Sequence, residues 1–322
     1  MDARSIRPAA ALCLSIALLI LSGCGERQKM LSIASGGTGG VYYPLAGGLA
    51  NLLSARMPGY QVTAEVTGGS VDNLKLVGSR RSDIGFTMVD AAWDALNGRE
   101  RFAADPQAIS TLAVLYPNRM HVVTVESTGI RTMAQLAGQR VSVGSPGSAT
   151  EVMALRVLEA YGLLDSVERA RLSVSESVNA IKDGKISAFF WAGGLPTAAI
   201  TDLAATPGVN LRLIDHADAV TSMNAKYGPL YSEGRIGREV YSGLEHDARN
   251  ANVWNIIIVS SELDEAVAYE VTRNLFENRD ALVAVHREAE QITLENQSGK
   301  FTPIPFHPGA VRYFRERGVD VE

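Results

Sequence analysis

The sequence of 322 residues predicts an α/β protein with two lobes and a ligand cleft between them. Apolar strand-like runs alternate with helix-periodic segments, a pattern typical of mainly parallel sheets covered by helices. Several of these runs end in a turn rich in glycine and serine that opens the next helix. The length suggests two domains, and because no proline- or serine-rich linker divides them, the chain is expected to cross between lobes more than once.

The first such turn, Ala-Ser-Gly-Gly-Thr-Gly-Gly-Val-Tyr-Tyr-Pro at 34–44, dominates the N-terminal part of the chain. It follows an apolar run at 30–34 and precedes an apolar-periodic segment at 45–55, so we expect a strand, a turn and a helix start. Such a turn leaves backbone N–H groups unpaired at the positive end of the helix dipole. The stretch therefore predicts a seat for an anion.

Comparable turns stand at 66–73, 143–151 and 192–196, after strand-like runs at 60–65, 140–142 and 186–191. Ser148 and Glu151 have the spacing of a capping box. Any one of these turns could be an ordinary α/β connection. Together they favour a single ligand held by several helix N-termini.

Motifs of other function classes are missing from the sequence. A dinucleotide fingerprint starting at Gly37 would need glycine where Tyr42 stands, and the two Gly-Lys pairs are followed by Ile186 and Phe301 rather than the serine or threonine of a P-loop. No serine stands in the Gly-x-Ser-x-Gly frame of a hydrolase. The five histidines lack metal-binding spacing. We therefore expect a protein that is not an enzyme, without catalytic residues, cofactor or metal.

The N-terminus is typical of export. Arg4 and Arg7 precede an apolar core at 9–21 that is too short to span a bilayer comfortably, and Leu-Ser-Gly-Cys at 21–24 resembles a lipobox. We predict a lipoprotein signal peptide at 1–23, acylation of Cys24 and a short tether at 24–29. The alternative is a signal peptide with a chance cysteine. Cys13 would leave with the signal, so the mature chain would have no thiol for a disulfide.

The other elements follow in order. Strand-like runs are expected at 82–88, 109–116, 120–126, 211–214 and 254–260, with a break at Pro117-Asn118. Helices are expected at 89–96, 132–136, 152–161, 175–182, 197–204, 219–227, 262–278 and 310–317. We predict crossing strands near 120–126 and 254–260, with lobe 1 formed by 30–120 plus 260–322 and lobe 2 by 121–259.

Six pieces in order resemble the TAXI family, the solute-binding subunits of TRAP transporters. They are Gly-Gly-Thr-Gly-Gly-Val-Tyr-Tyr-Pro at 36–44, Thr-Gly-Gly-Ser-Val-Asp-Asn-Leu at 67–74, Asp-Ile-Gly-Phe at 83–86, Gly-Ser-Pro-Gly-Ser-Ala-Thr at 144–150, Ala-Phe-Phe-Trp-Ala-Gly-Gly-Leu-Pro at 188–196 and Pro-Phe-His-Pro-Gly-Ala at 305–310. The resemblance covers nearly all of the mature chain. One segment departs from it, because 236–241 lacks the family's usual Ile-Pro-Ala-Gly-x-Tyr, in a loop that borders the cleft in such folds.

The resemblance implies a type II periplasmic-binding-protein-like fold that closes on a small carboxylated solute, a glutamate-like amino acid or a dicarboxylate such as 2-oxoglutarate. It implies delivery of that solute to TRAP permease membrane subunits, with signalling to a membrane sensor kinase as the alternative. The protein would be a monomer, lipid-anchored on the periplasmic or cell-surface side. Nucleic acid is not an expected partner, because the net charge is −5 and no basic block occurs.

Carried onto this chain, the resemblance assigns ligand contacts to both lobes. The predicted ligand-binding residues are Thr38, Gly39, Gly40, Tyr43, Ser70, Asn73, Ser145, Gly147, Ser148, Thr150, Ala192 and Gly193. Asp90 could meet an ammonium group or lie in the first turn of a helix. Trp191 is expected in the core. The arginines at 80, 81, 119 and 131 are possible carboxylate partners, but most of them are expected at the surface.

Overall fold

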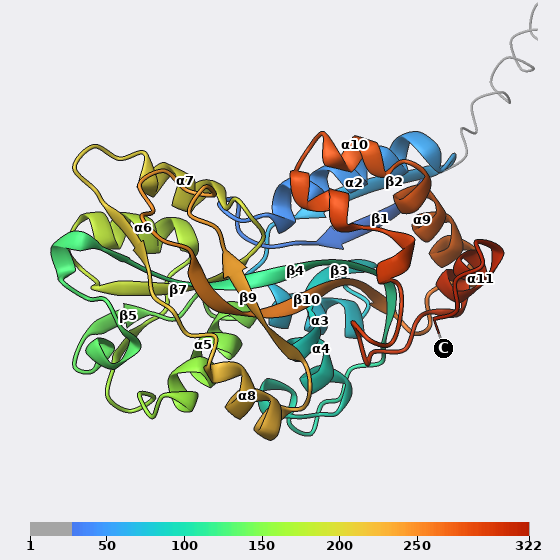
Figure 1. Cartoon of the computed structure of the whole chain (residues 1–322). Coiled ribbons are helices and arrows are strands. Elements are labelled where there is room, and N and C mark those ends of the chain that lie inside the picture. The colour runs from blue at the N-terminus through green and yellow to red at the C-terminus, as the bar shows by residue number, and fades with distance from the viewer. Residues whose placement is uncertain (1–27, 322) are drawn as a thin grey trace, which may run out of the picture.

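The computed structural model describes residues 28–321 (Figure 1). The predicted signal peptide, Cys24 and most of the predicted tether lie outside the described residues. Two groups of strands and helices lie side by side, joined by two long strands (Figure 1). We call the group that contains the N-terminal strands lobe 1 and the other group lobe 2, and we keep the sequence-based boundaries as our proposed limits of these lobes.

One mixed sheet of ten strands runs through both lobes in the order β2-β1-β3-β10-β4-β7-β5-β6, with β8 paired to β4 and β9 paired to β10. The pairs β1–β2, β1–β3, β5–β6 and β5–β7 are parallel. The long strands β4 and β10 are antiparallel to all their neighbours. The expectation of mainly parallel pairing therefore holds for the outer strands of each lobe and not for the centre.

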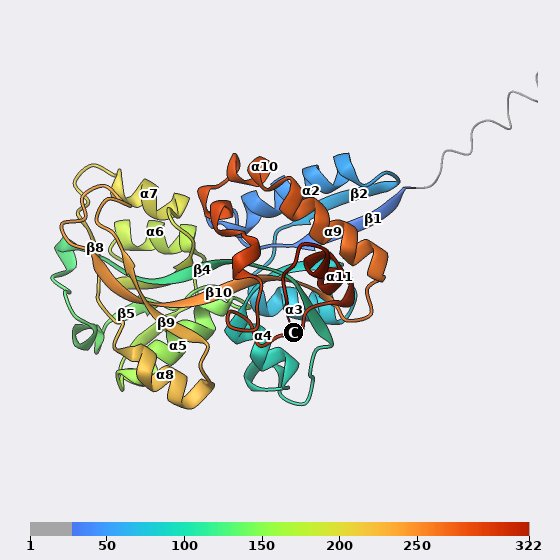
Figure 2. The same cartoon turned by 45° about the vertical axis from the view of Figure 1, so that its right-hand side comes forward.

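Lobe 1 is built on strands whose inner faces are apolar and that alternate with helices. Its elements are β1 (Lys29–Ala34), α2 (Tyr42–Arg56), β2 (Tyr60–Glu65), α3 (Ser70–Gly78), β3 (Ile84–Met88), α4 (Val89–Leu96) and η2 (Glu100–Phe102). The C-terminal elements α9 (Glu265–Glu277), α10 (Arg279–Val283), η5 (Arg287–Gln291), η6 (Leu294–Asn296) and α11 (Pro308–Glu316) return to this lobe. Figures 1 and 2 show α2, α9, α10 and α11 on one face of the sheet and α3 and α4 on the other.

Lobe 2 repeats the arrangement with shorter strands. Its elements are η3 (Glu126–Thr128), η4 (Met133–Leu136), β5 (Arg140–Ser142), α5 (Ala149–Ala160), β6 (Glu168–Ala170), α6 (Val174–Lys182), β7 (Ala188–Gly193), α7 (Ala198–Ala204), β8 (Leu211–Leu213), α8 (Ala219–Tyr227) and β9 (Tyr231–Ile236). Helices α6 and α7 cover one face, and α5 and α8 the other (Figure 2). Strands β6 and β9 have no counterpart among the predicted elements, since neither is strongly apolar.

The two lobes are joined by β4 (Ile109–Val125) and β10 (Ala248–Ser260). The predicted break at Pro117-Asn118 is wrong, because β4 is continuous there. Pro117 pairs with Trp254 next to a register shift, where the missing N–H of proline is tolerated. At this point β4 and β10 change partners. Asn255 is the β10 residue at which pairing to β3 begins, and Arg119 is the β4 residue at which pairing to β7 begins.

Apolar side chains fill both faces of the sheet. One buried cluster packs α3 and α4 of lobe 1 against α5 and α8 of lobe 2, so it continues beneath both lobes. A second cluster joins α2, α9 and α11 to lobe 1, and a third joins α6 and α7 to lobe 2. Within residues 28–321, no helix is long and apolar enough to cross a membrane.

Candidate functional site

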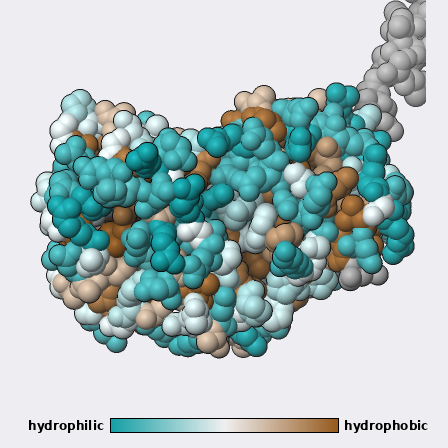
Figure 3. Space-filling model, in the orientation of Figure 1, coloured by the Kyte–Doolittle hydropathy of each residue, from teal (hydrophilic) through white to brown (hydrophobic). Residues whose placement is uncertain are grey.

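A cavity of about 230 Å³ lies between the lobes. It is lined by the segments that follow or end β1, β2 and β3 in lobe 1 and β5, β6 and β7 in lobe 2, so the carboxyl ends of strands from both lobes face it, as expected for an α/β fold. A notch in the upper outline of the molecule separates the two lobes (Figure 3).

Four helix N-termini converge on this cavity. Its lining includes Tyr42 of α2, Ser70 of α3, Ala149 of α5 and Val174 of α6, each the first residue of its helix or next to it. Each N-terminus carries about half a positive charge from its helix dipole. The lining contains no Asp, Glu, Lys, Arg or His side chain. The helix dipoles at these N-termini therefore favour an anionic group in the cavity.

Two buried hydroxyl groups add hydrogen-bond donors. Ser70 Oγ accepts the N–H of Met88 at 3.2 Å, and Thr150 Oγ1 accepts the N–H of Ala192 at 3.3 Å. Because each oxygen already accepts a backbone N–H, its own hydrogen can act as a donor. The Ser70 hydroxyl also hydrogen-bonds the Tyr42 side chain, which itself lines the cavity. These hydroxyls suit the oxygens of a carboxylate.

The lobes touch across the cavity, so the structure is a closed form. The N–H groups of Val71 and Asp72 donate to the carbonyl oxygen of Gly147 at 3.0 and 3.2 Å. Ser145 Oγ donates to the carbonyl oxygen of Gly68 at 3.4 Å. The turn at 66–73 was expected to aim its N–H groups at a ligand. Two of them instead hold the opposite lobe.

The floor of the cavity comes from β4. Tyr116 and Asn118 line it, and beneath them the side chain of Asn255 accepts hydrogen bonds from the Tyr42 hydroxyl and from Asn118 Nδ2. Asn255 Nδ2 donates to the carbonyl oxygen of Tyr116 at 2.9 Å. Burial raises the pKa of Tyr42 and of Tyr116 above the usual tyrosine value, so both hydroxyls are neutral at pH 7.

Most of the predicted ligand-binding residues are brought together in this lining. These are Thr38, Gly39, Gly40, Ser70, Ser145, Ser148, Thr150, Ala192 and Gly193. Ser148 also caps α5, because its hydroxyl accepts the Glu151 N–H and donates to the Ser145 carbonyl oxygen. Its hydrogen-bonding capacity is therefore largely used within the turn.

The other three predicted residues lie outside the lining. Tyr43 is exposed on α2, one position past Tyr42. Asn73 is fully buried and ties two loops to strand β3, since it donates to the carbonyl oxygens of Ser35 and Phe86 and accepts from Thr67. Gly147 contacts the opposite lobe through its carbonyl oxygen. Asn73 and Gly147 are therefore positioning residues in this closed form.

Sequence reasoning missed several lining residues: Tyr42, Tyr116, Asn118, Ser173, Ser175 and Trp191. Trp191 was expected in the core; it packs partly on the core of lobe 2, but its ring also lines the cavity beside Gly40 and donates from Nε1 to Thr197. The capping box of Ser173 and Glu176 was a signal for the fourth helix N-terminus. Nothing local marks Asn118 within a strand.

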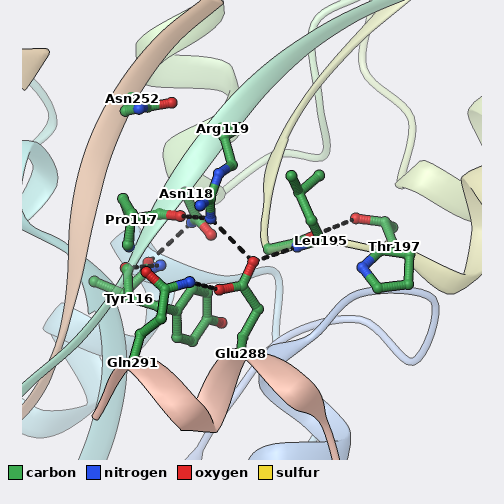
Figure 4. Close-up of polar contacts among 12 residues, drawn as sticks. Tyr116, Pro117, Asn118, Arg119, Leu195, Thr197, Asn252, Glu288 and Gln291 are labelled. Atoms are coloured by element: carbon green, nitrogen blue, oxygen red, sulfur yellow. Dashed lines mark hydrogen bonds and ion pairs between the residues drawn. The ribbon is translucent and has the colours of Figure 1, made fainter. Parts of the chain in front are cut away.

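A buried carboxylate joins lobe 1 to the segment after β7. Glu288 on η5 accepts the N–H of Leu195 at 2.6 Å and pairs with Arg119 at 3.0 Å (Figure 4). The Arg119 guanidinium is therefore already paired with a carboxylate of the protein itself. Arg80 and Arg131 form exposed ion pairs with Glu262 and Glu126, and no arginine lines the cavity.

A second buried network joins α4 to α5 and β9. Asp90 lies in the first turn of α4 and accepts from the Tyr231 hydroxyl at 2.9 Å, and Arg156 contacts Asp90, Asp94 and Tyr231. Asp90 does not line the cavity, so of the two roles left open for it the structure gives the helical one. Burial raises the pKa of Asp94 to about 6, and Arg156 opposes that rise.

The lining contains no His, Cys, Asp or Glu side chain and no residue of the segment 236–241. Among the described residues, no group of three or more His, Cys, Asp or Glu side chains could hold a metal ion. The segment 236–241, which departs from the TAXI pattern, packs behind the site: the buried Tyr241 hydroxyl accepts the Thr197 N–H at 3.0 Å and bonds His121.

The sequence pattern that defines the NMT1-like family matches residues 33–318, nearly the whole described chain. The chain belongs to the NMT1-like family. Among solved structures, this NMT1-like chain is similar to PhnD1 from Prochlorococcus marinus in complex with methylphosphonate, with 11% identity over 82% of this chain and 91% of that chain and a TM-score of 0.54.

Two other solved structures are similar to the NMT1-like chain at low identity. One is a putative L-cystine ABC transporter from Listeria monocytogenes, with 14% identity, coverage of 82% of this chain and 96% of that chain, and a TM-score of 0.51. The other is a binding protein component of an ABC phosphonate transporter from Pseudomonas aeruginosa, with 8% identity, coverage of 83% and 80%, and a TM-score of 0.52. The NMT1-like chain thus has the periplasmic-binding-protein-like fold.

Proposed function

We propose that this protein is an extracytoplasmic receptor that closes on a small carboxylated solute and delivers it to a membrane permease. The observation that carries the proposal is the cavity between the lobes, which collects four helix N-termini and no charged side chain. Its volume of about 230 Å³ is smaller than the roughly 300–1,000 Å³ of sites for drug-sized ligands. A solute of amino-acid or dicarboxylate size suits this space.

The direct contacts between lobes support ligand-dependent closure. A solute that bridges both lobes stabilises the closed form by its differential affinity. Solved structures of the same fold carry small anionic or zwitterionic solutes in their names, methylphosphonate and L-cystine. The receptor role is consistent with an exported, lipid-anchored chain.

The TAXI resemblance extends the proposal to TRAP permease subunits as the partner. Two of the similar solved structures are named for ABC transporters, so the choice between a TRAP permease and an ABC permease as the partner needs a direct test. Uptake of the solute by membrane vesicles that contain the partner permease should depend on an ion gradient and not on ATP. Dependence on ATP would replace the TRAP assignment with an ABC one and leave the receptor role intact.

The first experiment is a thermal-shift screen of a chain that starts at residue 25, which keeps every element the structure describes. A solute at 100 times its dissociation constant stabilises the folded state by about 2.7 kcal/mol, a rise in melting temperature of roughly 5 °C. We expect such a shift with glutamate, another amino acid or a dicarboxylate. A flat screen, together with no small acid released from the denatured protein in mass spectrometry, would overturn the proposal.

A further inference from the structure

Two buried polar atoms at the floor of the cavity have no hydrogen-bond partner within the part of the chain that the structure describes. They are the Tyr116 hydroxyl oxygen and Asn118 Oδ1, on side chains that are 0% and 2% exposed. Both residues line the cavity. Because an unpaired buried polar group costs free energy, such atoms at a binding site are expected to pair with the ligand.

The orientation of the Asn118 carboxamide follows from its neighbours. Asn255 Nδ2 donates to the Tyr116 carbonyl oxygen at 2.9 Å, which turns Asn255 Oδ1 toward Asn118 and the Tyr42 hydroxyl. That oxygen accepts from Asn118 Nδ2 at 2.9 Å. Asn118 Oδ1 is thereby left without a partner, on a residue that lines the cavity, and an amide oxygen can only accept.

Two parts of the cavity lining therefore require opposite kinds of ligand atom. We call the helix N-termini with the Ser70 and Thr150 hydroxyls the rim, and Tyr116 with Asn118 the floor. The helix N-termini and the hydroxyls of Ser70 and Thr150 donate, so they require acceptor atoms such as carboxylate oxygens. Asn118 Oδ1 requires an N–H or O–H. The Tyr116 hydroxyl, also without a partner, is neutral and can donate or accept. An unsubstituted dicarboxylate, or one with a 2-oxo group, offers no hydrogen for the floor.

We propose that Asn118 and Tyr116 form a subsite that selects solutes carrying an N–H or O–H donor beside the carboxylate. The favoured class is 2-amino or 2-hydroxy acids, in preference to the corresponding unsubstituted or 2-oxo acids. This inference rests on the proposed receptor function and narrows its solute. It makes the two β4 residues determinants of specificity, with the rim supplying the affinity for the carboxylate.

The test is calorimetric titration of the chain from residue 25 with acids that differ in one donor. The pairs are L-malate with succinate and L-glutamate with glutarate, and 2-oxoglutarate is added as the oxo acid. The acid with the donor in at least one pair should bind about 10- to 100-fold more tightly than its partner, because the partner leaves the floor unpaired. 2-Oxoglutarate should bind like the unsubstituted acids.

Two variants connect the preference to the floor. Asn118→Leu should reduce the preference within a pair to about threefold or less, mainly by weakening the acid that carries the donor. Tyr116→Phe removes a hydroxyl without a protein partner, so the fold should be kept while the preference falls. Asn250→Leu is the matched control, because Asn250 is an equally buried asparagine with an unpartnered Oδ1 outside the lining.

The outcomes separate this inference from the receptor function. Equal affinity within each pair for the unmodified chain would overturn the floor subsite and leave the receptor role standing. A preference that survives unchanged in folded Asn118→Leu and in Tyr116→Phe would also overturn it. If no carboxylate binds and none copurifies, the proposed function falls and the floor subsite falls with it.

Discussion

Gly68 offers the sharpest test of lobe closure, because a single methyl group placed there meets the opposite lobe. A Cβ at Gly68 would lie 2.7 Å from the carbonyl oxygen of Pro146 and 2.4 Å from Asp72 Oδ2. The Asp72 carboxylate can rotate away. The Pro146 oxygen belongs to the backbone of the turn before α5, so only separation of the lobes relieves that contact.

The size of the effect follows from the cross-lobe hydrogen bonds. The contact falls short of ordinary Cβ spacing by about 0.7 Å or more. Moving the lobes apart by that amount stretches the bonds from Val71 and Asp72 to Gly147, now 3.0 and 3.2 Å, toward or past the limit of a hydrogen bond. Losing one or two of them costs the closed form about 1–3 kcal/mol, which is roughly 5- to 150-fold in affinity.

The assay is calorimetric affinity for the best solute from the screen, with small-angle scattering to follow compaction on binding. Gly68→Ala should weaken binding and reduce compaction. Gly47→Ala is the control, since Gly47 lies within α2 with nothing near its Cβ position, and alanine there should stabilise the helix by about 1 kcal/mol without weakening binding. Affinity of Gly68→Ala within twofold of the unmodified chain, with normal compaction, would refute the reasoning.

Three further predictions concern stability and location. Burial lowers the pKa of His121 to about 4, so the unfolded chain takes up a proton at a higher pH than the folded chain, and stability falls as the pH drops from about 6.5 to 4. His121 should therefore lower the free energy of unfolding, measured in urea, by about 2 kcal/mol between pH 7.5 and pH 5.0. An equal pH dependence in His121→Gln would contradict the assignment. Arg156→Met leaves Asp90 and Asp94 buried without their cation and should cost about 3–5 kcal/mol in urea unfolding, whereas Arg249→Met at an exposed ion pair should cost less than about 1 kcal/mol; similar losses would argue against the buried network. Cys24→Ala should release the exported protein from membranes, and unchanged membrane association would defeat the lipobox interpretation.

The glycine-rich turns could be predicted because their signal is local. Glycine, serine and threonine between a strand and a helix favour an open turn whatever the rest of the chain does. Thr38, Gly39, Ser70 and Thr150, which the resemblance assigned to the ligand, stand in these turns, and all line the cavity. Long periodic segments such as α9 were predicted for the same reason.

Residues whose direction depends on helix phase or strand pairing could not be predicted. Tyr43 and Tyr42 are neighbours, but a helix that begins at Tyr42 turns one into the cavity and the other toward solvent. Asn118 follows Pro117, a pair that normally signals a break in a strand. Only the antiparallel pairing with β10 keeps β4 continuous there and places the carboxamide at the floor.

The sequence by itself determined the alternation of most strands and helices and the helix-opening turns, because these depend on backbone preferences within a few residues. The tertiary structure alone decided which of those turns meet. Val71 and Gly147 are distant in sequence, yet they bond across the cavity, and Glu288 returns from the C-terminal segment to hold Leu195. Such contacts are set by how two lobes pack on shared strands, a global balance of burial and hydrogen bonding that no short stretch encodes.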